Sequence, residues 1–213
     1  MLARKNPYLL RAKGIVTPRQ LIQAVLDAHL SSQEETLLGA FLEGLAIFLC
    51  RQAYRSSGKA TAEGIDLEFE RSGVRCLVAV KSGPNWANSS QIKRMRENFR
   101  QAAIIYRQGN KFRQIVCVNG CCYGKQPARS EDKGDYLKLC GQRFWEYITG
   151  DEEIYKRIIE PIGDKARERN EAFLCQFEIV LETFVGEFRS QFCGAHGSID
   201  WEKLVEFSSG KPA

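Results

Sequence analysis

The sequence predicts an α/β fold in which a central mixed β-sheet is flanked by helices. Helical patterns occupy both ends of the chain, and a stretch rich in alternating and β-branched residues lies between them. Hydrophobic residues make up 44% of the 213 residues and charged residues 27%, which is typical of a folded globular protein. We expect a single domain, 1–213, with a helical N-terminal part (1–58), a hairpin core (59–125) and a helical C-terminal part (126–213).

Two helices are predicted in the N-terminal part. Thr17 and Pro18 have the residue types of a helix start, and apolar residues then recur on one face to about Leu30. Ser32 and Glu35 have the spacing of a capping box, which predicts a second, heavily buried helix. We expect that helix to end in the polar run before residue 59.

The central part predicts a β-hairpin. Ile65–Glu70 alternates apolar and acidic residues, Arg71–Gly73 has the composition of a turn, and Val74–Val80 is a β-branched run. Asn88–Ser90 can cap a basic amphipathic helix from about residue 91 to 107. Gln114–Val118 reads as a short buried strand.

The C-terminal part is predicted to be helical, and its tail after Gly194 to be loop-rich apart from a turn near Trp201. The expected helices are Tyr136–Thr149, Glu152–Ile159 and Asp164–Gln191.

Asp66 and Lys81 are the strongest candidates for a catalytic pair. Asp66 lies near the start of one hairpin strand and Lys81 at the end of the next, and a hairpin with a short turn brings such positions side by side. Phosphodiester hydrolysis needs a carboxylate to hold a divalent metal ion, and a nearby lysine stabilises the developing negative charge. Periodicity alone also allows a plain reading, in which Asp66, Glu68 and Glu70 form a solvated strand face and Lys81 ends an apolar strand.

The motifs Gly64-Ile65-Asp66 and Ala79-Val80-Lys81 resemble the core of the PD-(D/E)XK nucleases. Longer blocks resemble the PmeII-type family of type II restriction endonucleases, namely Asn6–Tyr8, Asp27–Ser32, Leu42–Ala46, Lys81–Trp86 with Ser89–Gln91, and Val118–Gly124. The resemblance covers nearly the whole chain. It implies a restriction-endonuclease-like fold that hydrolyses both strands of double-stranded DNA at a short specific site, using Mg²⁺, for which Mn²⁺ can substitute.

One position departs from that pattern. The second acidic metal ligand of the superfamily would lie at Ala79, which has no carboxylate. Glu43 interrupts an apolar helix, where a charge is costly unless it is paired or bound to a metal, and the resemblance favours it because many such enzymes place a helical glutamate near the metal. Glu68 is the other main candidate, since strand periodicity puts it on the same face as Asp66, and Glu35 ranks third because its capping role already explains it. Alternatively, Ala79 marks an enzyme that has lost catalysis.

The segment that follows Lys81 is a candidate DNA-binding surface. Its polar groups and the positive end of the following helix suit phosphate, and the basic helix can follow a DNA backbone. The plain alternative is an ordinary loop with a helix cap and a solvated basic face. The candidate residues are Ser82, Asn85, Trp86, Asn88, Ser89, Gln91, Lys93 and Arg94.

Charge and cysteine usage add weaker expectations. The formal net charge of +5 permits a nucleic-acid partner without requiring one. No apolar run of membrane-spanning length and no export signal is evident, so we expect a cytoplasmic protein that is not membrane-bound. The 8 cysteines are then expected to be reduced, and ordinary buried thiols are favoured over a structural zinc site, although Cys193 and His196 have a plausible ligand spacing.

Cutting both strands of a near-palindromic site is most simply done by a two-fold symmetric homodimer. A cognate DNA methyltransferase acting separately is a possible partner. Three other functions remain open: a catalytically inactive DNA-binding protein, a repair or structure-specific nuclease on the same core, and a structural protein without any nucleic-acid role. The last would show no salt-dependent DNA binding.

Overall fold

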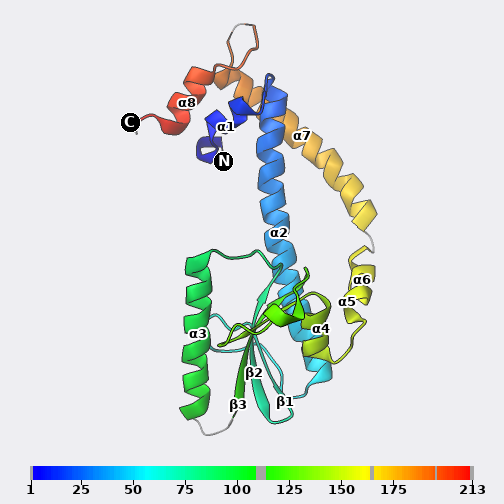
Figure 1. Ribbon diagram of the computed structural model, residues 1–213. Coiled ribbons are helices and arrows are strands. Elements are labelled where there is room, and N and C mark those ends of the chain that lie inside the picture. Colours follow the sequence, from blue (N-terminus) through cyan, green and yellow to red (C-terminus); the bar gives the residue numbers. More distant parts are fainter. Residues whose placement is uncertain (1, 109–113, 164–165, 195, 212–213) are drawn as a thin grey trace. The chain divides into compact units, whose positions relative to one another are not determined.

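The computed structural model describes residues 2–108, 114–163, 166–194 and 196–211. These residues form two compact units, a helical unit (Met1–Glu35 and Gly163–Ala213) and a sheet unit (Thr36–Ile162), shown in Figure 1. The elements are η1 (Leu2–Arg4), α1 (Pro7–Ala12), α2 (Pro18–Ala53), β1 (Leu67–Arg71), β2 (Val74–Lys81), α3 (Ser89–Gln108), β3 (Gln114–Cys121), η2 (Ala128–Ser130), β4 (Leu137–Cys140), α4 (Gln142–Thr149), α5 (Ile154–Arg157), α6 (Ile159–Gly163), α7 (Ala166–Phe192) and α8 (Trp201–Ser209). Whether the chain folds as a single domain stays a prediction.

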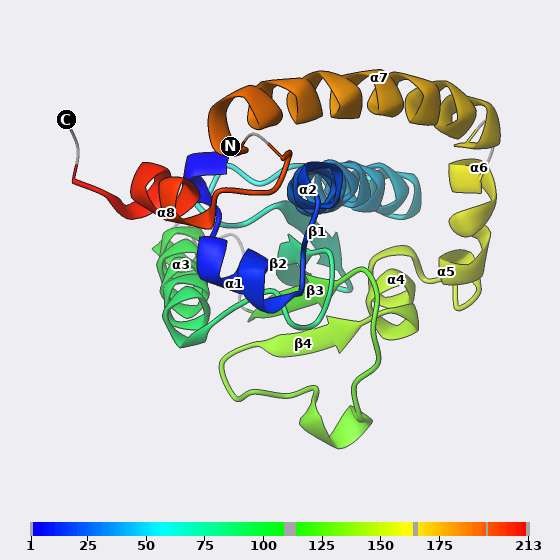
Figure 2. The same ribbon diagram turned by 90° about the horizontal axis from the view of Figure 1, so that it is seen from above.

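The sheet unit confirms the predicted mixed sheet. Its four strands lie side by side in the order β1-β2-β3-β4 (Figure 2), with β1 antiparallel to β2 and the other two pairs parallel. The predicted hairpin closes through Ser72 and Gly73, between the paired residues Arg71 and Val74. Both turn residues have positive φ, 52° and 78°, as the tight turn favoured by strand twist requires.

Helices cover both faces of this sheet. One apolar cluster joins strand residues such as Phe69 and Val78 to Ala46 of α2 and Phe144 of α4. A second cluster joins Leu77 and Ala79 to the buried side of α3. Because side chains alternate along a strand, the acidic positions of β1 lie on the α3 face. The sheet therefore sits between α3 on one side and the C-terminal half of α2 with α4 on the other.

The prediction of two separate N-terminal helices is wrong, because α2 runs unbroken for 36 residues. Ser32 and Glu35 match a capping box, but no proline follows Pro18 within the helix, and serine and glutamate are both tolerated in a helix interior. The joined helix is long and apolar enough to cross a membrane by length and composition, a test that core helices of soluble proteins also pass. Its two ends contribute buried residues to the apolar cores of the two units.

The prediction of one helix over Tyr136–Thr149 is also wrong, because Leu137–Cys140 is strand β4, parallel to β3. A four-residue strand is too short for periodicity to separate it from a helical turn. The helix α4 begins only after Gly141, which has a φ of 53°. A Cβ atom at Gly141 would lie 2.6 Å from the carbonyl oxygen of Gly124, so the residue that joins β4 to α4 must be glycine.

The helical unit has its own apolar core, in which Leu21 and Val25 of α2 meet Leu181 and Val185 of α7. The prediction of a long C-terminal helix agrees with α7, although residues 164 and 165 lie outside the described residues. The turn expected near Trp201 is instead the nine-residue helix α8. The helix predicted over Glu152–Ile159 is replaced by the short α5 and the start of α6.

Candidate active site

The hairpin brings Asp66 and Lys81 together, as its predicted geometry requires. The Asp66 amide donates to the carbonyl of Val78 at 2.9 Å, which continues the hairpin one residue beyond β1. The Asp66 Oδ2 atom accepts a hydrogen bond from the Val80 amide at 2.7 Å and lies 3.6 Å from the Lys81 Nζ atom. These side chains are 22% and 28% exposed, so solvent and a substrate can reach both.

Trp86 lies on the other side of the lysine. The Lys81 Nζ atom is 5.1 Å from the centroid of the Trp86 ring, which is within the range of a cation–π interaction. Trp86 also packs against the apolar cluster beneath α3, so its ring is held in place. The Lys81 ammonium group therefore has a carboxylate and an aromatic face as neighbours.

Glu68 shares the strand and the face of Asp66 but has a partner of its own. The Tyr106 hydroxyl of α3 donates a hydrogen bond to the Glu68 Oε2 atom. Burial, and then this hydrogen bond, raise the pKa of Tyr106 to about 12, so the phenol stays protonated as a donor at neutral pH. One oxygen of the Glu68 carboxylate is thus engaged by α3.

Glu43 lies on α2, near the C-terminal ends of the parallel strands. Its Oε1 atom is 3.8 Å from the Nζ atom of Lys59, and its side chain is 33% exposed. Burial, assisted by the negative charge of Glu43, raises the pKa of the Cys122 thiol to about 12. Cys122 donates its backbone amide to the Lys81 carbonyl at 2.9 Å, which links the surroundings of Glu43 to the end of β2.

Ala79 cannot contribute a ligand, and its side chain is enclosed. It is 1% exposed in the cluster beneath α3, and its register partner on β3 is Asn119, a polar residue that is 2% exposed. Across the described ranges, no three side chains of His, Cys, Asp or Glu lie close enough together to bind a metal ion by themselves. A bound cation would therefore use one or two carboxylates, with water or substrate oxygens completing its shell, which is a common arrangement for Mg²⁺.

The loop after Lys81 ends in a reciprocal cap. The Gln91 amide donates to the Asn88 Oδ1 atom at 3.0 Å, and the Asn88 amide donates to the Gln91 Oε1 atom at 2.9 Å. This arrangement explains both residues as the N-terminal cap of α3. Asn85 and Ser89 are exposed, and Ser82 is half-buried.

The basic candidates lie on the exposed surface of α3. Lys93 and Arg94 are both exposed, and the Arg94 Nη2 atom forms an ion pair with the Glu63 Oε1 atom at 2.9 Å. They belong to a larger basic groove that is described below.

Sequence patterns missed two residues that shape this site. Tyr106 of α3 fixes Glu68 of β1, but nothing in the local sequence of Tyr106 points to a contact between that helix and that strand. Lys138 of β4 donates from Nζ to the Pro84 carbonyl at 2.9 Å and so anchors the loop after Lys81. Its role could not be seen because β4 was predicted to be helical. Asn119 is a polar residue within an otherwise apolar strand, and that exception in the sequence could have drawn attention to β3 beside Ala79.

The buried cysteines near the site are held as neutral thiols. Burial is the largest cause that raises the pKa of Cys121 to about 12, as it is for Cys122. Cys121 lies on β3, where its register partners are Lys81 on β2 and Cys140 on β4. A protonated thiol packs as a small apolar side chain and is not a metal ligand.

The family model described as type II restriction endonuclease EcoO109I matches residues 1–170, well over half of the 213 residues. That range includes the complete sheet unit and all the candidate site residues described above. No curated protein matches the chain.

Proposed function

Since the chain belongs to the EcoO109I family of type II restriction endonucleases, we propose that it hydrolyses both strands of DNA at a short specific site with a divalent metal ion. The observation that carries the proposal is the placement of Asp66 beside Lys81 at the end of the catalytic hairpin, 3.6 Å apart and open to solvent. Family membership supports DNA as the substrate, and the proximity of Asp66 and Lys81 supports the sheet unit as the location of the reaction.

Each side chain would have a distinct task. Asp66 would hold the cation, which when bound supplies positive charge to the scissile phosphate and lowers the pKa of a coordinated water. Lys81 would stabilise the negative charge that develops on the phosphate or orient the attacking water. Trp86 would keep the Lys81 ammonium group in position when Asp66 is engaged by the cation.

We assign the missing carboxylate to Glu43 in preference to Glu68. Glu68 already accepts a hydrogen bond from Tyr106, whereas among the described residues Glu43 has only a 3.8 Å ion pair with an exposed lysine. The influence of Glu43 on Cys122 supports a position near the strand ends that carry Lys81.

The Glu43→Gln variant should raise the Mg²⁺ concentration for half-maximal cleavage by about 10-fold or more, because a cation contact is lost. The Glu68→Gln variant should change it by no more than about two-fold and serves as the matched control, since both changes remove one negative charge. The measurement is the rate of DNA cleavage across a Mg²⁺ titration. The opposite ranking would assign the ligand to Glu68.

The activity itself is tested by incubating the purified protein with plasmid and larger genomic DNAs in Mg²⁺, and again in Mn²⁺. We expect discrete, reproducible fragments that share one end sequence. Intact DNA with either metal would contradict the proposal, and salt-dependent binding without cleavage would then favour the inactive DNA-binding protein that Ala79 suggests. Cleavage confined to branched or damaged DNA would favour a structure-specific nuclease.

Several finer assignments are part of this proposal. The resemblance to the PmeII-type family rests on the motif blocks quoted above, including the run from Lys81 to Trp86. A homodimer is supported by the symmetry of a site cut on both strands. The proposal also includes a cytoplasmic location, expected above from the sequence, and a separately acting methyltransferase, which suits the expected role in restriction and modification.

A further inference from the structure

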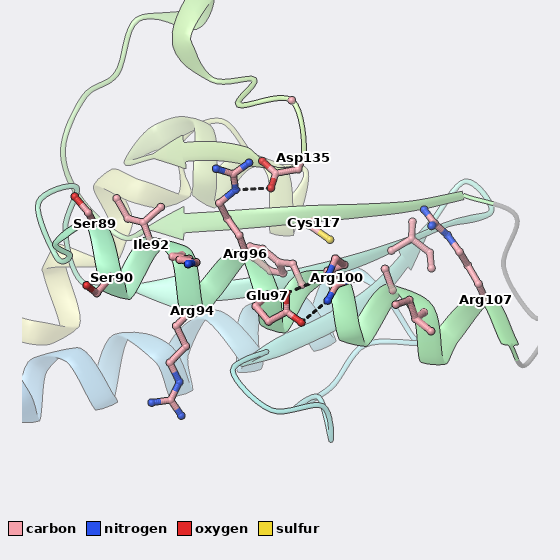
Figure 3. Close-up of a pocket in the computed structure, with 16 residues that line it drawn as sticks. Ser89, Ser90, Ile92, Arg94, Arg96, Glu97, Arg100, Arg107, Cys117 and Asp135 are labelled. Atoms are coloured by element: carbon pink, nitrogen blue, oxygen red, sulfur yellow. Dashed lines mark hydrogen bonds and ion pairs between the residues drawn. The ribbon is translucent and has the colours of Figure 1, made fainter.

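A long groove lies along one side of α3, outside the catalytic cluster. Its volume is about 1310 Å³ (Figure 3). One wall is α3, and the other is formed by β3 together with residues 134–135. Its floor includes apolar side chains such as Phe99 and Ile115. Five cationic side chains line it, namely Lys93, Arg94, Arg96, Arg100 and Arg107.

The two carboxylates of the groove are neutralised within it. The Arg96 Nε atom lies 2.6 Å from the Asp135 Oδ2 atom, and the Arg100 Nη2 atom lies 2.7 Å from the Glu97 Oε1 atom (Figure 3). Hydrogen bonds from Arg100 and Gln101 lower the pKa of Glu97 to about 2, so it is fully ionised in its pair.

Of the remaining cations, Arg94 pairs with Glu63, whereas Lys93 and Arg107 have no such partner among the described residues. Among the described residues, no carboxylate lies within ion-pair distance of Lys93 or Arg107, and both side chains are exposed. These residues lie near opposite ends of α3. The groove therefore has unpaired positive charge near both of its ends, which suits a polyanion that spans its length.

The groove begins close to the catalytic residues. Its lining starts at Ser89 and Ser90, the first residues of α3, and Trp86, just upstream, contacts Lys81. The N-terminus of this 20-residue helix adds positive potential at that end. From Ser89 to Arg107 the helix rises by about 27 Å, which corresponds to about eight base pairs of duplex at about 3.4 Å each.

We propose that this groove, the α3 groove, binds the phosphate backbone of duplex DNA that flanks the cleavage site. The inference rests on the proposed function, because it takes Asp66 and Lys81 as the point of cleavage. Lys93 contacts DNA close to that point, and Arg107 contacts DNA that lies further out. Flanking DNA then adds affinity without adding sequence specificity, since phosphate contacts carry no base information.

The test is a binding measurement with Ca²⁺ in place of Mg²⁺, over a range of salt concentrations. Two duplexes carry the site identified by plasmid cleavage: a short one limited to the site and a long one extended by about eight base pairs on each side. We expect Arg107→Gln to reduce the salt slope by about one on the long duplex alone, and Lys93→Gln to reduce it by about one on both duplexes. Arg157→Gln, an exposed arginine on α5, is the charge-matched control and should leave both slopes unchanged.

Two results would overturn the groove assignment while leaving the proposed function intact. In the first, the wild type binds and cleaves DNA but both groove variants keep its salt slopes. In the second, poly-glutamate binds the wild type and not the Arg107→Gln variant, which would assign the groove to an acidic polypeptide. Failure of the wild type to bind either duplex would instead count against the proposed function itself. Equal urea midpoints for all variants would exclude unfolding as the cause.

Discussion

The Asp66→Asn variant is expected to fold like the wild type and to lose DNA cleavage by about 1,000-fold. An asparagine oxygen can still accept the hydrogen bond that the Val80 amide gives to Asp66 at 2.7 Å, so the end of the hairpin keeps its contact. The substitution removes the negative charge that would hold the cation. It also removes the charge that faces the Lys81 Nζ atom at 3.6 Å.

The measurement is the initial rate of cleavage in Mg²⁺, with a urea denaturation curve for each protein. Glu70→Gln is the matched control because it removes one negative charge from the same strand, at a position paired with Arg75 and away from Lys81. Cleavage by Asp66→Asn within about ten-fold of the wild-type rate would show that Asp66 does not hold an essential cation. The hairpin carboxylate would then be part of an ordinary solvated strand face.

The Lys81→Met variant should have the second largest effect, a fall in kcat of about 100-fold or more. Methionine keeps an unbranched apolar chain of similar length against Trp86 but removes the ammonium group. The charge acts on the transition state more than on bound DNA, so the KM for DNA should change by much less than kcat. Lys81→Arg should restore only part of the rate, because a planar guanidinium cannot reproduce the geometry of a compact ammonium group.

Single-turnover cleavage with enzyme in excess over DNA measures this step directly. Lys133→Met, which removes an exposed lysine from the loop before β4, is the control for loss of one positive charge. A normal single-turnover rate in Lys81→Met would mean that the lysine only ends an apolar strand. A large rise in KM at unchanged kcat would make it a DNA-binding residue without a role in the chemical step.

The features that could be predicted from the amino-acid sequence are those formed by residues close together in the chain. The alternating run before Arg71, the turn at Ser72 and Gly73 and the β-branched run after it were enough to predict the hairpin, and with it the proximity of Asp66 and Lys81. The start of α3 was also predictable, because Asn88 caps a residue three positions away. Short sequence patterns predict such interactions, because both partners lie within a few residues of each other or on either side of one tight turn.

Tertiary structure decided what depends on residues far apart in the chain. Leu137–Cys140 becomes a strand because β3 offers it a parallel edge, and the four residues by themselves do not reveal that edge. Ser32 does not start a new helix, because no residue near it breaks the one already formed. Glu68 accepts a hydrogen bond from Tyr106, 38 positions away. That contact is the reason why Glu43 is preferred to Glu68 as the candidate metal ligand. Local propensity fixes the chemistry that each segment can offer, while packing between distant segments fixes which of those groups meet.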